Sequence, residues 1–185
     1  GCAYYAEFDC AELDLDRFTA AWQTLVERHD MLRAVFPDNE HQQVLETVPP
    51  LHIPVRDGGD AAQMRELMSH HTFEPSQWPL FDVQGVRTGG RVRIGITLDN
   101  LIVDALSIFL LFDELDRLYT DPAAPLRHVG VTFRDYEMNN RPSAEQVAAA
   151  QEYWLGRLDE LPPAPELPLA IDPGRIETPR FGRAE

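Results

Sequence analysis

Two neighbouring stretches near the middle of the chain carry different patterns of apolar and polar side chains. Over 91–98, apolar residues alternate with polar or small ones, which predicts a half-buried strand. Over 106–118, apolar residues dominate the first turns, which predicts a helix buried on most of its sides. Two carboxylates, Asp99 and Asp104, lie between them. Because burying a charge is costly unless it is paired, both need a compensating partner.

The rest of the pattern predicts strands and helices in mixed order. Strands are predicted at 3–9, 32–36, 42–48, 51–55 and 81–87, with one hairpin turn at 37–40 and another at 88–90. Helices are predicted from Asp14 or Asp16 to about residue 29, and over 61–71, 132–139 and 143–161. Ser143 and Gln146 form a capping box for the last helix. Hairpins mixed with helices indicate an α+β fold, a mixed α/β sandwich.

The spacing of the two carboxylates is compatible with purely structural roles. Asp104 is suited to be the N-cap of the following helix, and Ser107 could add to that capping. Asp99 could be a solvated strand end. The spacing alone leaves these roles and a functional one open.

Composition and charge narrow the class of protein. The 185 residues suit one domain, and the net charge of −15 argues against nucleic acid or an anionic membrane as partner. The longest apolar run, 105–112, is too short to span a bilayer, so we expect a cytoplasmic protein. Cys2 and Cys10 have no spacing typical of a zinc site. We therefore predict neither a metal nor a directly bound cofactor.

Five short stretches carry recognisable combinations of residues. They are Tyr5-Ala6-Glu7-Phe8-Asp9, Arg28-His29-Asp30-Met31-Leu32-Arg33, Trp78-Pro79-Leu80-Phe81-Asp82, Asp99-x4-Asp104-x2-Ser107 and 153–165. In this order they resemble the heterocyclization domains of nonribosomal peptide synthetases, which are the cyclizing variants of condensation domains. Ordinary condensation domains carry His-His-x3-Asp-Gly at the fourth stretch, where this chain has Asp99, Asn100 and Ala105 in place of the two histidines and the glycine. An aspartate in place of the first histidine separates the cyclizing branch from the amide-forming one.

The resemblance extends from about residue 1 to residue 183 and implies an architecture. Each such domain has two chloramphenicol-acetyltransferase-like lobes that form a V around a tunnel. This chain would be the N-terminal lobe, 1–185, incomplete at both ends, with an irregular proline-rich tail at 162–185. Its expected partners are upstream and downstream carrier domains, an adjacent adenylation domain and the missing C-terminal lobe. The substrates would arrive on the phosphopantetheine arms of the carriers.

The resemblance also implies a role for the second aspartate. It pairs Asp104 with Arg33, or alternatively with Arg28, and it gives Asp104 a mainly structural role at the catalytic site. A bidentate guanidinium would suit a buried carboxylate. Ser107 is expected to support the same turn.

The first aspartate is expected to act closer to the reaction. Asp99 would face the tunnel, where it would line the catalytic site and could orient the attacking amine or accept its proton. Asn100 could offer a hydrogen bond to the site, but we favour a role in holding the strand end.

The implied reaction has two stages. The amine of carrier-bound Cys, Ser or Thr attacks an acyl thioester, and its side chain then closes a thiazoline or oxazoline with loss of water. We expect an enzyme as part of the complete domain and no activity from this chain alone. Two alternatives remain open: an amide-forming or degenerate condensation domain, and a non-catalytic docking module with an acidic surface.

Overall fold

A computed structural model describes residues 2–163, 168–169 and 171–176. The chain divides into two compact units, Gly1–Asn139 and Asn140–Glu185. The first unit holds a sheet, its covering helices and α4 (Phe133–Asn139), and the second holds α5 (Ala144–Leu155).

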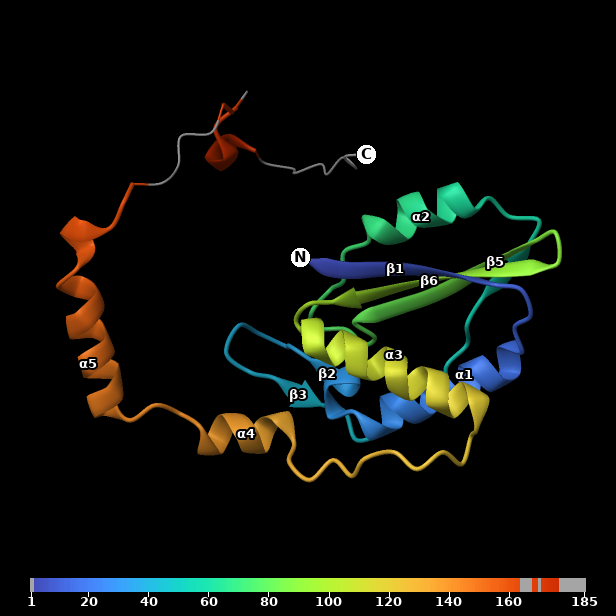
Figure 1. The fold of residues 1–185 in the computed structure, drawn as a ribbon, viewed down its shortest axis with the longest axis horizontal. Coiled ribbons are helices and arrows are strands. Elements are labelled where there is room, and N and C mark those ends of the chain that lie inside the picture. Colours follow the sequence, from blue (N-terminus) through green and yellow to red (C-terminus); the bar gives the residue numbers. More distant parts are fainter. Residues whose placement is uncertain (1, 164–167, 170, 177–185) are drawn as a thin grey trace. The chain divides into compact units, whose positions relative to one another are not determined.

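The first unit is built on a four-stranded sheet with the order β1-β6-β5-β4 (Figure 1). Its strands are β1 (Ala3–Cys10), β4 (Val55–Asp57), β5 (Phe81–Thr88) and β6 (Arg91–Asp99). β6 pairs antiparallel with β1 on one side and with β5 on the other, whereas β4 runs parallel to β5. Gly89 and Gly90 take positive φ angles in the β5–β6 turn, which glycine adopts without strain. The strands predicted at 3–9, 81–87 and 91–98 and the second hairpin are confirmed.

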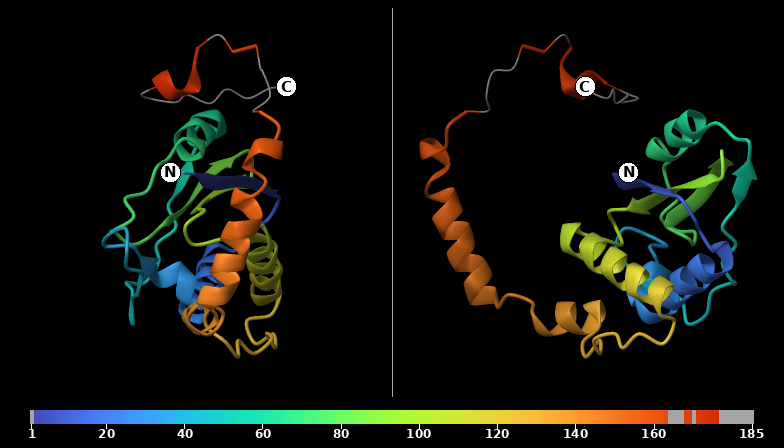
Figure 2. Two further views of the ribbon diagram at one scale, coloured as in Figure 1. Left: turned by 90° about the vertical axis from the view of Figure 1, so that its left-hand side faces the viewer. Right: turned by 45° about the vertical axis from the view of Figure 1, so that its right-hand side comes forward.

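Two helices, α1 (Leu15–Arg28) and α3 (Ala105–Thr120), lie side by side on one face of the sheet, and α2 (Ala61–Ser69) covers the other (Figures 1 and 2). The α1/α3 side holds the main core, in which the most deeply buried side chains are Trp22, Leu25, Val26, Leu32, Leu80, Ile94, Ile96 and Leu98. α1 begins at the N-cap Asp14, whose carboxylate accepts a hydrogen bond from the Arg17 backbone N–H. This geometry selects Asp14 over Asp16.

The expectation that α3 is buried on most of its sides is wrong. Its buried positions form one stripe, namely Ile108, Leu111, Glu114, Leu115 and Leu118. In contrast, the side chains of Leu106 and Phe109 are 78% and 73% exposed. A helix that packs on a single sheet layer buries only the stripe that faces the sheet, whatever the composition of its other faces.

The first predicted hairpin is present but much shorter than expected. Its strands are β2 (Ala34–Val35) and β3 (Gln43–Val44). The residues before β2 form a 3-10 turn, Asp30–Arg33, because the Leu32 N–H bonds the His29 carbonyl and not a neighbouring strand. Likewise, only the end of the extended segment predicted at 51–55 joins the sheet: the Pro54 carbonyl accepts a hydrogen bond from the Gly85 N–H, and the strand begins at Val55.

The second unit confirms one capping prediction and corrects a helix length. Ser143 and Gln146 form the reciprocal capping box at the start of α5. The helix predicted over 143–161 ends at Leu155, followed by a 3-10 turn at Leu158–Glu160. The predicted tail, 162–185, lies partly outside the described residues.

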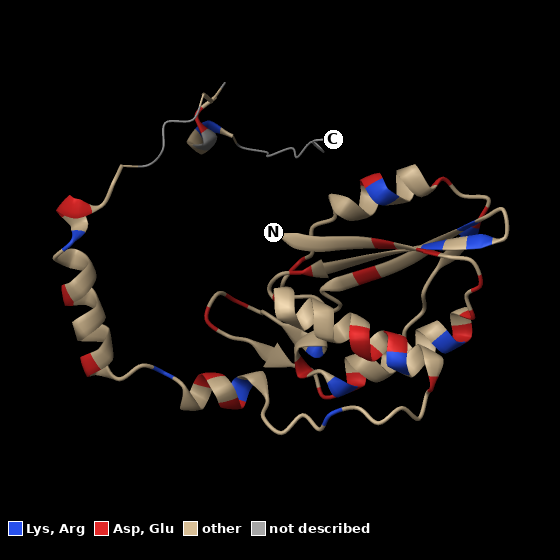
Figure 3. Cartoon of the chain, viewed as in Figure 1, with Lys and Arg blue, Asp and Glu red and all other residues tan. Residues whose placement is uncertain are grey.

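A polar cluster ties α2 to its face of the sheet. Glu7 of β1 accepts hydrogen bonds from the Tyr5 hydroxyl at 2.8 Å and from the Arg65 guanidinium of α2, with Nη2 at 2.7 Å. Arg93 of β6 lies 3.7 Å from the same carboxylate. In Figure 3, ribbon segments coloured for basic and for acidic residues lie close together on this part of the sheet. The bond from Arg65 is the main cause that lowers the pKa of Glu7, against the opposing effect of burial.

Gly95 lets α2 approach the sheet closely, and its replacement by alanine tests this contact. A Cβ atom at position 95 would lie 2.8 Å from the Met68 sulfur and 3.1 Å from the Tyr5 hydroxyl. Met68 is buried and Tyr5 is bonded to Glu7, so neither can withdraw freely. We expect Gly95→Ala to lower the free energy of unfolding by about 1–3 kcal/mol in urea denaturation.

Gly130→Ala is the matched control, because the nearest heavy atom to its added Cβ would be His128 Cδ2 at 4.0 Å. Equal stability of the two variants would contradict the close-approach argument.

Candidate functional site

Asp99 is the last residue of β6, and its side chain is only 4% exposed. Strand alternation places it on the same face as Thr97 and Gly95, which is the face that α2 covers. Its Oδ1 accepts a hydrogen bond from the Leu101 backbone N–H at 2.9 Å, and its carbonyl accepts one from Ile102 at 3.1 Å. Asp99 is therefore not a solvated strand end: it is a buried carboxylate that closes the turn after the strand.

Asp104 has the helix-capping role that its position in the sequence predicted. It is the N-cap of α3, and its Oδ1 accepts a hydrogen bond from the Ser107 backbone N–H at 2.7 Å. The bonds from the Ser107 backbone and hydroxyl lower the pKa of this carboxyl. Unlike Asp99, Asp104 is exposed. The capping prediction is confirmed, with Ser107 as the partner.

The predicted pairing of Asp104 with Arg33 or Arg28 is wrong in this structure. Arg33 bonds Asp30 at 2.7 Å and also donates to the carbonyls of Val26 and Leu45. Arg28 bonds a different carboxylate, on α3. Because Asp104 is exposed and already caps the helix, it needs no buried cation.

Asn100 ties the end of β6 to the start of β1. Its backbone N–H donates to the Cys2 carbonyl at 2.9 Å, and its side-chain amide lies 3.2 Å from the Cys2 sulfur. Both contacts support the favoured role of Asn100 in holding the strand end.

Glu114 on α3 is a buried carboxylate that the sequence analysis missed. It is 4% exposed and binds Arg28 through two hydrogen bonds of 3.1 Å, while His29 Nε2 lies 2.6 Å from its Oε2. Arg28 also donates to the Arg127 carbonyl. Burial opposes ionisation, but the bonds from Arg28 and His29 outweigh it and hold the pKa of Glu114 below its ordinary value of 4.5. The available signal was a glutamate in the apolar stripe of a predicted helix.

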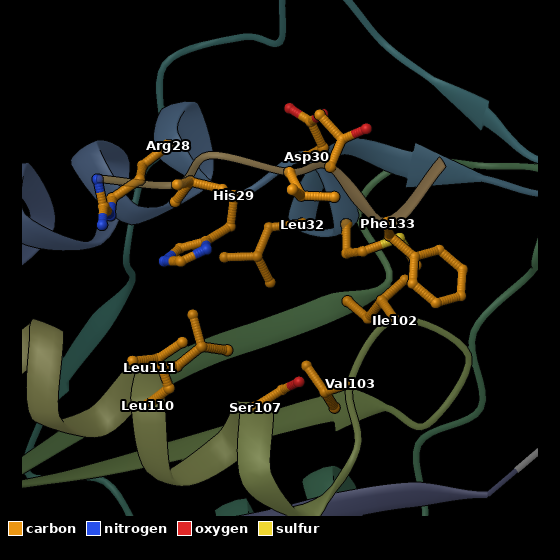
Figure 4. A pocket seen from close by; sticks show the side chains of 14 residues that line it. Arg28, His29, Asp30, Leu32, Ile102, Val103, Ser107, Leu110, Leu111 and Phe133 are labelled. Atoms are coloured by element: carbon orange, nitrogen blue, oxygen red, sulfur yellow. The ribbon is translucent and has the colours of Figure 1, made fainter. Parts of the chain in front are cut away.

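A cavity of about 330 Å³ opens beside this ion-pair cluster (Figure 4). Its walls come from the 3-10 turn Asp30–Arg33 and the residues before it, the turn after β6, the first turns of α3 and the segment leading into α4. The lining side chains are Arg28, His29, Asp30, Met31, Leu32, Ile102, Val103, Ser107, Leu110, Leu111, Val129, Val131, Thr132 and Phe133. Two of the stretches singled out in the sequence, 28–33 and 99–107, thus meet at one cavity.

Asp99 and Asp104 do not line this cavity. Across the described residues, no group of three or more His, Cys, Asp or Glu side chains is arranged to hold a metal ion. In the same part of the chain, no helix is long and apolar enough to cross a membrane.

The family model of the condensation domain matches residues 6–180. The chain belongs to the condensation domain family. It is 37% identical over 190 residues to pyochelin synthetase PchF of Pseudomonas aeruginosa, covering 96% of this chain and 10% of that protein. It is 30% identical over 191 residues to phenyloxazoline synthase MbtB of Mycolicibacterium paratuberculosis, covering 95% of this chain and 16% of that protein.

A solved structure agrees with the fold of this condensation-family chain. The EpoB cyclization-docking bidomain of the nonribosomal peptide synthetase from Sorangium cellulosum superposes with a TM-score of 0.84 at 32% identity, over 96% of this chain and 38% of that one. The mixed α/β fold expected for a condensation-type lobe is thus confirmed. The chain spans a small part of each of these relatives.

Replacing Glu114 tests whether its ion pairs stabilise the lobe. Glu114→Gln leaves the Arg28 guanidinium without its buried counter-charge, so we expect it to lower the free energy of unfolding by about 3 kcal/mol at neutral pH. Because the folded pKa is depressed, the stabilisation is full above the ordinary glutamate pKa and disappears as the pH falls through the folded value. The difference between wild type and variant should therefore shrink in acid, as measured by urea unfolding over a pH series.

Asp113→Asn is a control on the same helix, because Asp113 forms only an exposed pair with Arg117 at 2.9 Å. We expect it to change stability by less than about 0.5 kcal/mol. If both variants lost the same stability at every pH, the buried cluster would not be the cause.

Proposed function

We propose that this chain is the N-terminal lobe of a heterocyclization domain. In the first stage, the amine of carrier-bound Cys, Ser or Thr attacks the carbon of an upstream acyl thioester. The carbon–sulfur bond breaks, the upstream carrier thiol leaves and an amide forms. In the second stage, the thiol or hydroxyl of the same residue attacks the amide carbonyl. The new carbon–sulfur or carbon–oxygen bond closes the ring. The former carbonyl oxygen then departs as water, with the proton of the amide nitrogen, and leaves the carbon–nitrogen double bond of the thiazoline or oxazoline.

The observation that carries this proposal is Asp99, a buried carboxylate where amide-forming condensation domains have their first histidine. The names of two relatives support it, since MbtB is a phenyloxazoline synthase and EpoB contains a cyclization domain. A neutral imidazole can take a proton from an amine near neutral pH. A carboxylate at the same position is a weaker base in water, but it carries a negative charge and can accept a hydrogen bond from the attacking group.

The two aspartates then have separate roles in the proposed mechanism. Asp99 Oδ1 is held by the Leu101 N–H, which fixes the orientation of the carboxyl group. Within the described residues, no arginine or histidine side chain bonds this carboxylate. We propose that Asp99 lines the substrate path and orients the attacking group or accepts its proton. Asp104 acts indirectly, because it caps the start of α3 and so fixes the position of the turn.

In this proposal the lobe supplies one wall of the reaction tunnel, and a second lobe supplies the other. The upstream and downstream carrier domains bring the substrates on phosphopantetheine arms, and no separate cofactor takes part. We therefore expect the chain by itself to give no turnover.

The function is tested on the intact synthetase that contains this domain. The upstream carrier is loaded with an acyl group and the downstream carrier with cysteine, and the downstream carrier is followed by intact-mass spectrometry. We expect a product lighter by one water than the open-chain amide. The control is the same system loaded with alanine, which has no nucleophilic side chain and should stop at the amide.

Two results would contradict the proposal in different ways. A stable amide from cysteine that never loses water would identify an amide-forming condensation domain. No acyl transfer from fully loaded carriers would point to a non-catalytic or docking role.

A further inference from the structure

The charged and hydroxyl groups around the cavity beside α3 are already engaged within the lobe. Arg28 and His29 both bind Glu114, and Asp30 binds Arg33. Ser107 bonds Asp104 through both its backbone and its hydroxyl. A charged ligand would therefore have to compete with existing ion pairs, whereas an uncharged one meets apolar walls.

The apolar side chains that line the cavity form a buried floor and an exposed rim. The floor consists of Leu32, Ile102, Val103 and Leu111, which are all buried. At the rim, the side chains of Leu110 and Phe133 are 49% and 46% exposed. Figure 4 shows Leu110, Leu111, Ser107 and Val103 along one side of the cavity, with His29 and Leu32 across from them.

The cavity is connected to the candidate site through the backbone. Ile102 and Val103 belong to the turn that runs from Asp99 to Asp104, and the Ile102 N–H bonds the Asp99 carbonyl. A ligand seated against these two side chains would contact the turn that positions both aspartates, from the α1/α3 side of the sheet, whereas the Asp99 carboxylate lies on the α2 face.

The volume of the cavity indicates which of the two substrates of the proposed reaction it could bind. A volume of about 330 Å³ lies at the lower end of the range for small-molecule pockets. The side chain of Cys, Ser or Thr is far too small to fill it, but a branched aliphatic or aromatic acyl group is large enough.

We propose that this cavity binds the uncharged, apolar acyl group of the upstream thioester, and that Leu110 at its rim limits the size of that group. This inference rests on the proposed function, since it concerns a substrate of the same reaction. A wider rim would admit larger acyl groups, and a bulkier side chain at position 110 would exclude them.

The test is a competition between two acyl donors on the intact synthetase. Upstream carriers loaded with acetyl and benzoyl groups are mixed in equal amounts, and intact-mass spectrometry gives the ratio of benzoyl to acetyl transferred to the downstream carrier. We expect Leu110→Trp to lower this ratio by at least about tenfold, as is usual when a hydrophobic pocket loses room for its ligand. Leu110→Ala should keep or raise it.

Leu106→Trp is the matched control, because Leu106 lies on the same helix, does not line the cavity and is 78% exposed. We expect this variant to leave the ratio within about twofold of wild type, a change below the discrimination typical of a pocket contact. If Leu110→Trp abolished transfer of both groups, Leu110→Phe would supply the ratio.

An unchanged ratio in the Leu110 variants would overturn the proposal. It would also be overturned if the variants discriminated between cysteine and threonine on the downstream carrier and not between acyl donors. The ratio counts acyl transfer whether or not water is lost afterwards. If cyclization failed, the proposed function would be contradicted, but the ratio of the two acyl groups would still test whether the cavity binds the acyl donor.

Discussion

The hydrogen bonding of β6 on both of its sides is the constraint on which the rest of the lobe depends. β1 pairs with β6 from Ala3 opposite Asp99 to Cys10 opposite Val92, and β5 pairs with its other side from Phe81 opposite Leu98. Because side chains alternate along a strand, a slip of one residue would move Asp99 to the opposite face and expose the core. The sheet therefore decides which way the candidate catalytic carboxylate points.

Glu114 fixes the positions of the two helices that pack on the sheet. Its bonds to Arg28 and His29 join the middle of α3 to the end of α1, and Arg28 also holds the backbone at Arg127. The cavity wall is assembled from these same elements. The strand thus sets the direction of Asp99, the cap at Asp104 starts the helix, and the ion pairs fix where that helix lies. Substrate positioning in the proposed reaction depends on all three together.

Local patterns made much of this predictable from the sequence. The alternation of apolar and polar residues predicted β5 and β6, and capping residues predicted the starts of α1, α3 and α5. Both kinds of pattern depend on residues close together in the chain. The Glu114 cluster joins residues 86 positions apart, so no local pattern reveals it. The exposure of Leu106 and Phe109 escaped prediction because composition does not say how many layers cover a helix. A family resemblance suggested the Arg33–Asp104 pair, but Arg33 is used by its own turn.

The two nearby aspartates have different roles in the proposed reaction, and single-turnover rates of the intact synthetase distinguish these roles. Asparagine can still accept the Leu101 bond at position 99 and still cap α3 at position 104, so neither substitution should unfold the lobe. We expect Asp99→Asn to slow product formation at least about a hundredfold, whereas Asp104→Asn should keep the rate within about threefold. A slower Asp104→Asn enzyme, with Asp99→Asn near wild type and both folded, would contradict these roles.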